Sequence, residues 1–219
     1  MKMIALGFLS IHSFFCFDQS SNTSNAWLLA QLKVDYKRQT HVLELGHRRY
    51  ENFLNHHRQS LFRYTFSYQA NSKRTGFGGG IAGFIHERNE GRRIETEIRP
   101  FLQVSQLFLK KAIQFQLRFR NEFRFFDRST KDQDRLRFQM LFSYPLHSDC
   151  KTRLLCFNEW FYICGSMKPW EWRGGVSIQQ PLLRHWKLGI GYIYQNNENS
   201  AIRNIHVIQL SGSYNLLLN

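Results

Sequence analysis

The residues with the most reactive side chains form a regular pattern of arginine and glutamate in the middle of the chain. Between Ile113 and Phe125 every second residue is polar, and this polar set includes Arg118, Arg120 and Glu122. Guanidinium and carboxylate groups that share a face can form ion pairs or attract small anions. The candidate charges of this kind are Arg63, Glu95, Glu97, Arg99, Arg118, Arg120, Glu122, Arg124, Arg135 and Arg137.

Catalytic chemistry finds less support in the sequence. Residues 147–149, His-Ser-Asp, are the residue types of a hydrolase triad, but three neighbours in one short loop cannot converge on a substrate. His47, His86 and His206 fall within predicted strands, and none has an evident serine partner. An enzyme is therefore not the favoured interpretation. The alternative that stays open is a lipid-modifying barrel enzyme of the acyl hydrolase or acyltransferase type.

Neither a metal nor a cofactor is expected. Cys150, Cys156 and Cys164 show no CxxC motif and no Cys/His spacing that would suit zinc. The glycines 78–80 lack the Lys-Ser/Thr pair of a phosphate-binding loop. Glycines at these positions are instead expected to permit barrel curvature or a close approach between strands.

The elements that must position the charges are strands, because the hydrophobic pattern has a period of two. Between residues 113 and 125 the odd positions are almost only Phe, Ile and Leu, and a helix would spread them over its whole circumference. Eleven such segments begin near Trp27, Val42, Gln59, Gly76, Arg93, Ala112, Asp134, Thr152, Trp170, Trp186 and Asn204. Since single-chain bacterial barrels have even strand numbers, we predict ten or twelve strands.

The amino terminus has the layout of a secretory signal peptide. A charged start at Lys2 is followed by an apolar run from Ile4 to Phe17 and then by a polar stretch ending in small residues. We predict that residues 1–26 are a cleavable signal peptide, cut between Ala26 and Trp27, and that residues 27–219 form the barrel.

Composition restricts the class of protein. Of 219 residues 42% are hydrophobic, too many for a disordered chain, and the mean hydropathy of −0.44 argues against a bundle of membrane helices. The net charge of +14 would suit nucleic acid, anionic lipid or an anion-lined interior. Nucleic acid is not an expected partner, because the arginines alternate along strands and the chain is expected to be exported.

Aromatic residues favour a membrane barrel over a soluble one. The chain has 20 Phe, 9 Tyr and 5 Trp, more bulk than the interior of so small a barrel could hold. Candidates for aromatic belts at the two membrane interfaces are Trp27, Tyr50, Tyr68, Tyr144, Trp170, Trp172, Trp186, Tyr194 and Tyr214. The run 209–216 resembles the carboxy-terminal strand that barrel-assembly machinery reads. Outer-membrane lipids and that machinery are thus the expected partners of a monomer.

Several runs resemble one known family in their order along the chain. They include Arg118–Phe125, Arg135–Phe138, Ser143–Leu146 (Ser-Tyr-Pro-Leu) and Gly189–Tyr194. On these residues the chain resembles domain-of-unknown-function family 2490, exported proteins of Gram-negative bacteria that are regarded as outer-membrane barrels. The resemblance spans nearly all of residues 27–219. It implies fold and location, and it brings no known catalytic residues.

The sequence therefore predicts an all-β protein, a single antiparallel up-and-down transmembrane β-barrel in the bacterial outer membrane. Apolar side chains are expected to face lipid, and the candidate charges are expected to face the lumen. Two functions stay open for that lumen: a packed core of ion pairs, or a narrow, porin-like pathway that prefers anions.

Overall fold

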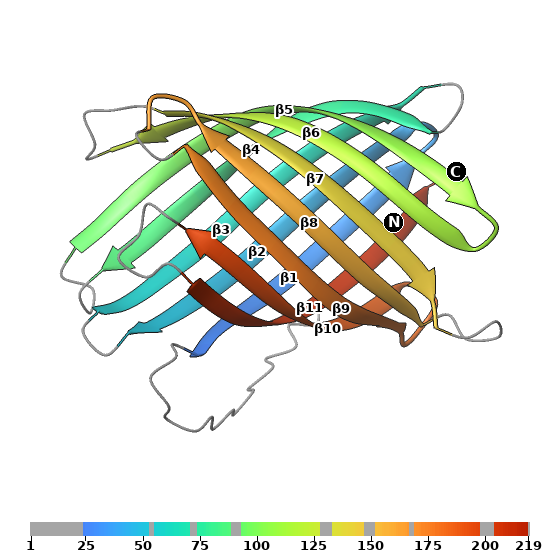
Figure 1. Ribbon diagram of the computed structural model, residues 1–219. Coiled ribbons are helices and arrows are strands. Elements are labelled where there is room, and N and C mark those ends of the chain that lie inside the picture. Colours follow the sequence, from blue (N-terminus) through green and yellow to red (C-terminus); the bar gives the residue numbers. More distant parts are fainter. Residues whose placement is uncertain are drawn as a thin grey trace, which may run out of the picture.

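A closed barrel of β-strands is the whole of the described fold (Figure 1). The computed structural model describes residues 24–52, 55–70, 74–88, 93–127, 133–146, 152–166, 169–197 and 204–218. Residues 1–23 of the predicted signal peptide, the His-Ser-Asp run 147–149 and Cys150 lie outside the described residues. The predicted all-β barrel is confirmed.

Eleven strands occur in the described residues. They are β1 (Ser24–Tyr36), β2 (Gln39–Asn52), β3 (Asn55–Gln69), β4 (Thr75–Arg88), β5 (Arg93–Lys110), β6 (Ile113–Phe126), β7 (Gln133–Pro145), β8 (Arg153–Ile163), β9 (Trp170–Pro181), β10 (Trp186–Asn197) and β11 (Asn204–Leu218). Two-residue turns join β1 to β2 and β5 to β6, and Lys37 and Lys111 take the positive φ that such hairpin turns require. Across these same ranges, no helix is long and apolar enough to cross a membrane.

The predicted strand number of ten or twelve is wrong for this structure, which closes with eleven. Each strand pairs antiparallel with the next along the chain, so β1 and β11 run in the same direction. They close the barrel as a parallel pair, with a continuous register from Ser24 opposite His206 to Tyr36 opposite Leu218. An odd number can therefore close at the expense of one parallel seam, as in the odd-numbered barrels of mitochondria.

The first strand begins upstream of the predicted cleavage position. Ser24, Asn25 and Ala26 already pair with β11, and Asn25 donates a hydrogen bond from Nδ2 to the carbonyl oxygen of His206 at 3.0 Å. The Asn25 side chain is buried. A cut after Ala26 would thus remove three residues from the closing seam of the barrel.

The two faces of the sheet have opposite chemistry. Large apolar side chains are exposed on the outer face of every strand, as with Leu102 on β5 (65% exposed) and Ile190 on β10 (53%). The inner face instead buries charged side chains, among them Glu97, Arg120 and Arg137. This arrangement is the inverse of a soluble barrel, whose apolar residues would fill the interior.

Three glycines of β4 allow two strands to approach closely, as the sequence predicted for the run 78–80. A Cβ atom on Gly78 would lie 2.1 Å from the carbonyl oxygen of Phe66, and one on Gly80 would lie 2.1 Å from that of Tyr64. A Cβ atom on Gly79 would lie 2.8 Å from the carbonyl oxygen of Phe101. No side chain fits at these separations without movement of the backbone.

We expect Gly80→Ala to lower the free energy of unfolding by about 1–3 kcal/mol, because the added methyl group overpacks against β3. Gly83→Ala on the same strand is the matched control, since a Cβ atom there meets nothing within 4 Å. It should change stability by less than about 0.5 kcal/mol. Urea unfolding of the two variants in lipid vesicles measures the difference, and equal effects would contradict the proposed role of Gly80.

Candidate functional site

Three buried glutamates organise the interior of the barrel. Glu97 on β5 and Glu122 on β6 are 1% exposed, and Glu159 on β8 is fully buried. A buried carboxylate is stable only where cations or hydrogen-bond donors surround it. We call these three residues and the seven arginines paired with them the interior charge network; the arginines are Arg99, Arg118, Arg120, Arg124, Arg135, Arg137 and Arg173.

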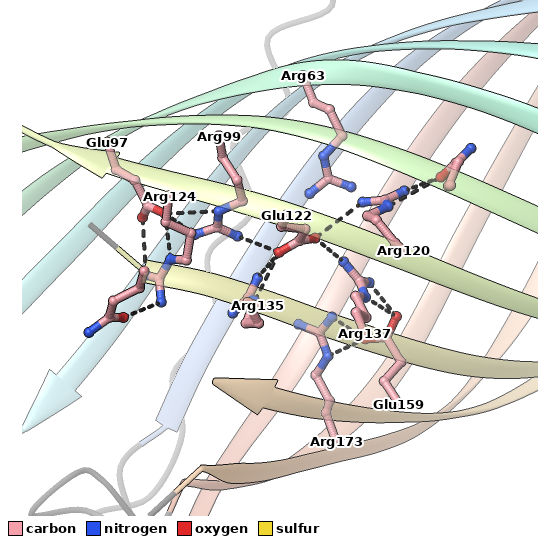
Figure 2. Close-up of polar contacts among 12 residues, drawn as sticks. Arg63, Glu97, Arg99, Arg120, Glu122, Arg124, Arg135, Arg137, Glu159 and Arg173 are labelled. Carbon is pink, nitrogen blue, oxygen red and sulfur yellow. Dashed lines mark hydrogen bonds and ion pairs between the residues drawn. The ribbon is translucent and has the colours of Figure 1, made fainter. Parts of the chain in front are cut away.

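Glu122 lies at the centre of this network (Figure 2). Arg135, directly opposite on β7, donates to Oε2 of Glu122 from Nε at 2.9 Å and from Nη2 at 2.5 Å. Arg99, Arg137 and Arg120 approach the same carboxylate at 3.5, 3.5 and 3.6 Å. Glu122 therefore balances arginines from β5, β6 and β7 at once.

Glu97 is the glutamate of the network that lies nearest to β4. Oε1 of Glu97 accepts hydrogen bonds from Nε of Arg99 at 2.8 Å and from Nε of Arg124 at 2.7 Å. Nε2 of the buried His86 lies 3.2 Å from Oε2 of Glu97, and Nδ1 of the same ring lies 3.1 Å from Nε2 of Gln59. The carboxylate thus links β4, β5 and β6.

Glu159 links β7, β8 and β9 through ion pairs with arginines. Arg137 binds its Oε1 and Arg173 binds its Oε2, each through Nε and Nη2. Arg173 lies directly opposite Glu159 in the β8–β9 register. Arg99 contacts both Glu97 and Glu122, and Arg137 contacts both Glu122 and Glu159. The three carboxylates therefore form one continuous network (Figure 2).

Aromatic rings inside the barrel support the guanidinium groups. Phe161 lies beneath three of them, with the Cζ atoms of Arg135, Arg137 and Arg173 at 4.8, 5.3 and 5.3 Å from its ring centre. Phe101 and Phe84 lie 4.1 Å from Cζ of Arg120 and Arg99 respectively. These cation–π contacts hold the flat face of each guanidinium group against an aromatic ring, while its N–H groups point toward a carboxylate.

The structure places all ten candidate charges on inward positions, and eight belong to the interior charge network. Glu97, Arg99, Arg118, Arg120, Glu122, Arg124, Arg135 and Arg137 meet within it, including both of its β5 and β6 carboxylates. Arg63 instead pairs with Glu44, directly opposite on β2, at 3.4 Å. Glu95 is buried two residues before Glu97 on β5 and lies directly opposite His86 on β4.

Sequence reasoning missed Glu159 and Arg173 as members of this site, and it gave His86 only as a single lumen or rim residue without a partner. Arg173 carries a usable signal, because it alternates with the outward residues Trp170 and Trp172. Glu159 is harder to find, because β8 is apolar on both faces and its alternation is weak.

A cavity of about 210 Å³ lies in the barrel interior beside the network. Its walls come from β1, β2 and β3 on one side and from β7 to β11 on the other. Arg48, Arg63, Arg137 and Arg173 line it together with the two glutamates Glu44 and Glu159. The lining is completed by the apolar residues Trp27, Leu28, Leu29, Gly46, Leu61, Phe157 and Ile193 and by the amides Gln139 and Gln209.

The prediction that Trp27 belongs to an outer aromatic belt is wrong. Trp27 is 5% exposed, packs against Ile193 and Val207 inside the barrel, and holds Arg48 at 3.8 Å from its ring. The side chain of Tyr50 lies outside the described residues. The other predicted belt residues point outward, and pairs such as Trp186–Tyr214 and Trp172–Tyr194 contact each other at 5.1 and 5.4 Å.

One histidine does have a serine partner, contrary to the sequence-based expectation. Nδ1 of His47 lies 3.3 Å from Oγ of Ser60, directly across β2 and β3 on the outer face. The outward residues His41 and His206 make the same kind of cross-strand contact with the hydroxyl groups of Tyr64 and Tyr192. Outward histidines thus contact tyrosine hydroxyl groups in the same way as the serine hydroxyl group. This indicates that the contacts supply hydrogen-bond partners to outward imidazole rings, which is a different role from that of a catalytic pair.

Within the described ranges, no group of three or more His, Cys, Asp or Glu side chains could hold a metal ion. The His86–Glu97 contact is instead part of the interior charge network.

The known proteins that are similar to this chain include one family and two distant barrels. The model of a family described as "Protein of unknown function (DUF2490)" matches residues 24–206, and no curated protein matches the chain. A loop L8 deletion mutant of OmpT, an outer membrane protein of Vibrio cholerae, is 11% identical with a TM-score of 0.43, covering 79% of this chain and 61% of that one. Outer-membrane expressed OmpT of Vibrio cholerae is 9% identical with a TM-score of 0.42, covering 71% and 55%. The chain thus spans about three fifths of the length of these structures or less.

Proposed function

The chain belongs to the DUF2490 family of proteins of unknown function, and we propose that it is an outer-membrane β-barrel protein whose lumen is a packed core of ion pairs. The observation that carries this proposal is the inversion of the two faces, with apolar side chains outside and buried, paired charges inside.

The outer face supports a lipid environment. Soluble monomers rarely expose a contiguous apolar patch of more than a few hundred Å². Here large apolar side chains are exposed on all eleven described strands, with Phe77, Ile98 and Leu102 each more than half exposed. A surface of this kind is stable against hydrocarbon and would aggregate in water.

Aromatic residues at both strand ends support the same location. On β10, Trp186 and Tyr194 are eight residues apart, which is about 27 Å along an extended strand. A tilt of about 40° reduces this to roughly the thickness of the apolar band of an outer-membrane barrel. Trp170 and Tyr144 extend the two belts to β9 and β7.

Export and assembly complete the proposal. The amino-terminal layout supports cleavage of a signal peptide before insertion into the outer membrane of a Gram-negative bacterium. Residues 209–216, within β11, would be recognised by the barrel-assembly machinery. The inserted protein would be a monomer with outer-membrane lipids as its partners.

Burial inside the lumen favours a packed core over an open pathway. Water in an open lumen would reach the inward side chains, but Arg120 is 2% exposed and Arg137 7%. Contacts between Arg137 and two separate glutamates fix its position, so that no side chain there can swing aside without breaking ion pairs. The interior therefore acts as a structural brace across β4 to β9.

We expect protein recovered from the outer-membrane fraction to show no steady single-channel conductance in planar bilayers, because the interior charge network fills the lumen. Mass measurement on the same sample reports whether the amino-terminal segment has been removed. Steady anion-selective conductance that is reduced in Arg118→Ala or Arg137→Ala would overturn the packed core. Recovery of the intact chain from the cytosol would overturn the location.

A further inference from the structure

We propose that the cavity inside the barrel binds a small organic anion, a carboxylate attached to a compact apolar group. The cavity combines Arg63, an arginine with an unused donor, with apolar lining residues, and neither feature is needed for the packed core described above.

One arginine that lines the cavity has a hydrogen-bond donor without an acceptor among the described residues. Arg63 lines the cavity, and its Nη1 lies 3.4 Å from the carboxylate of Glu44. Its buried Nε has no hydrogen-bond partner in the part of the chain that the structure describes. By contrast, Arg135 makes two bonds to Glu122 at 2.5 and 2.9 Å. A guanidinium with spare donors is the group that recognises a carboxylate through two parallel hydrogen bonds.

Arg118 does not itself line the cavity, but it has an equally loose ion pair with a residue that does, Glu159. Arg118 approaches Glu159 at 3.9 Å, and its buried Nε also has no partner among the described residues. Arg118 lies close enough to Arg63, Arg120 and Arg137 to be repelled by them. An anion placed between Arg63 and Arg118 would therefore reduce repulsion as well as accept hydrogen bonds.

The charge balance of the interior points the same way. Among the ion pairs described for the network and for Glu44–Arg63, eight guanidinium groups face four carboxylates. On the side of the cavity, Arg63, Arg118, Arg137 and Arg173 face the two carboxylates of Glu44 and Glu159. A bound anion would offset part of this excess.

The lining of the cavity also has apolar side chains that suit an apolar or aromatic group. Trp27, Leu61 and Phe157 line the cavity, and Ile193 is buried against Trp27. The indole Nε1 of Trp27 is buried without a partner in the described residues. A volume of about 210 Å³ equals that of about seven water molecules at ~30 Å³ each. This space is smaller than a drug-binding pocket and fits a compact molecule such as benzoate.

Calorimetric titration of the full chain in detergent with benzoate tests the proposal. We expect saturable binding that weakens at least tenfold in Arg63→Gln and in Arg118→Gln. The matched control is Arg153→Gln, an inward arginine of β8 that hydrogen-bonds Ser143 and Ala112, neither of which lines the cavity. Its affinity for benzoate should stay within twofold of the unchanged protein. Far-UV circular dichroism verifies that each variant is folded.

Inorganic phosphate and chloride separate an organic ligand from any small anion. We expect both to bind at least tenfold more weakly than benzoate, because neither contacts the apolar wall. Absence of benzoate binding, equal binding of the three anions, or equal binding by folded Arg63→Gln would each overturn the proposal. These outcomes leave the membrane location and the absence of conductance untouched, since those are measured separately.

Discussion

Glu122→Gln is expected to lower the free energy of unfolding by about 3–5 kcal/mol, the cost of leaving buried charges without their partner. The substitution keeps the size of the side chain and one acceptor oxygen but removes the negative charge. Arg99, Arg120, Arg135 and Arg137 would then face one another around a neutral amide. Urea unfolding in lipid vesicles, followed by tryptophan fluorescence, measures the loss.

Glu44→Gln is the matched control for this effect. Glu44 also faces inward, but its ion pair with Arg63 is a single contact at 3.4 Å. We expect a loss of no more than about 1 kcal/mol, as for other weak ion pairs. The double variant Glu122→Gln/Arg135→Gln should recover part of the stability, because it removes one of the uncompensated cations. Equal losses in Glu122→Gln and Glu44→Gln would contradict a central role for Glu122.

The positions of the strands could be predicted from the sequence because each strand has two chemically different faces. Predicted and observed starts coincide at Arg93, Trp170, Trp186 and Asn204. The largest difference is at β3, which begins at Asn55 rather than near Gln59. Its first residues are polar on both faces, so hydrophobic alternation gives no signal there.

Barrel closure could not be predicted in the same way. Eleven segments were visible in the sequence, but a general preference for even numbers led to ten or twelve. Closure depends on whether β1 and β11 can pair, and this involves residues about 180 positions apart whose register leaves no local pattern. The parallel seam is thus a property of the whole barrel.

The sequence predicts which charged residues belong to the candidate site, but it does not predict which of them pair with one another. Alternation identifies Glu97, Glu122 and Arg137 as inward residues. The finding that Arg137 links Glu122 to Glu159 depends on the registers of β6, β7 and β8 together. The cavity is equally invisible in the sequence, because Trp27 and Arg63 reach it from strands that are distant from Phe157 along the chain.

Leu102→Arg is expected to destabilise the membrane-inserted protein by about 2–4 kcal/mol, the cost of an arginine facing lipid at the middle of a bilayer. Leu102 is 65% exposed on the outer face and lies near the centre of β5. Phe108→Arg is the matched control, because Phe108 is on the same face of the same strand, two residues from its end. There the arginine can reach the interface, and the expected cost falls to about 0–1 kcal/mol.

The difference between these two variants distinguishes a membrane barrel from a soluble one. In water an arginine on an exposed position changes stability little wherever it lies along the strand, so both variants would resemble the unchanged protein. In lipid the cost must depend on depth, because only the central residue places its charge far from water. Unfolding of both variants from vesicles, compared with the unchanged chain, gives the two costs. Equal values for Leu102→Arg and Phe108→Arg would mean that the outer face does not contact hydrocarbon, and the apolar residues on it would then have to be covered by another protein surface.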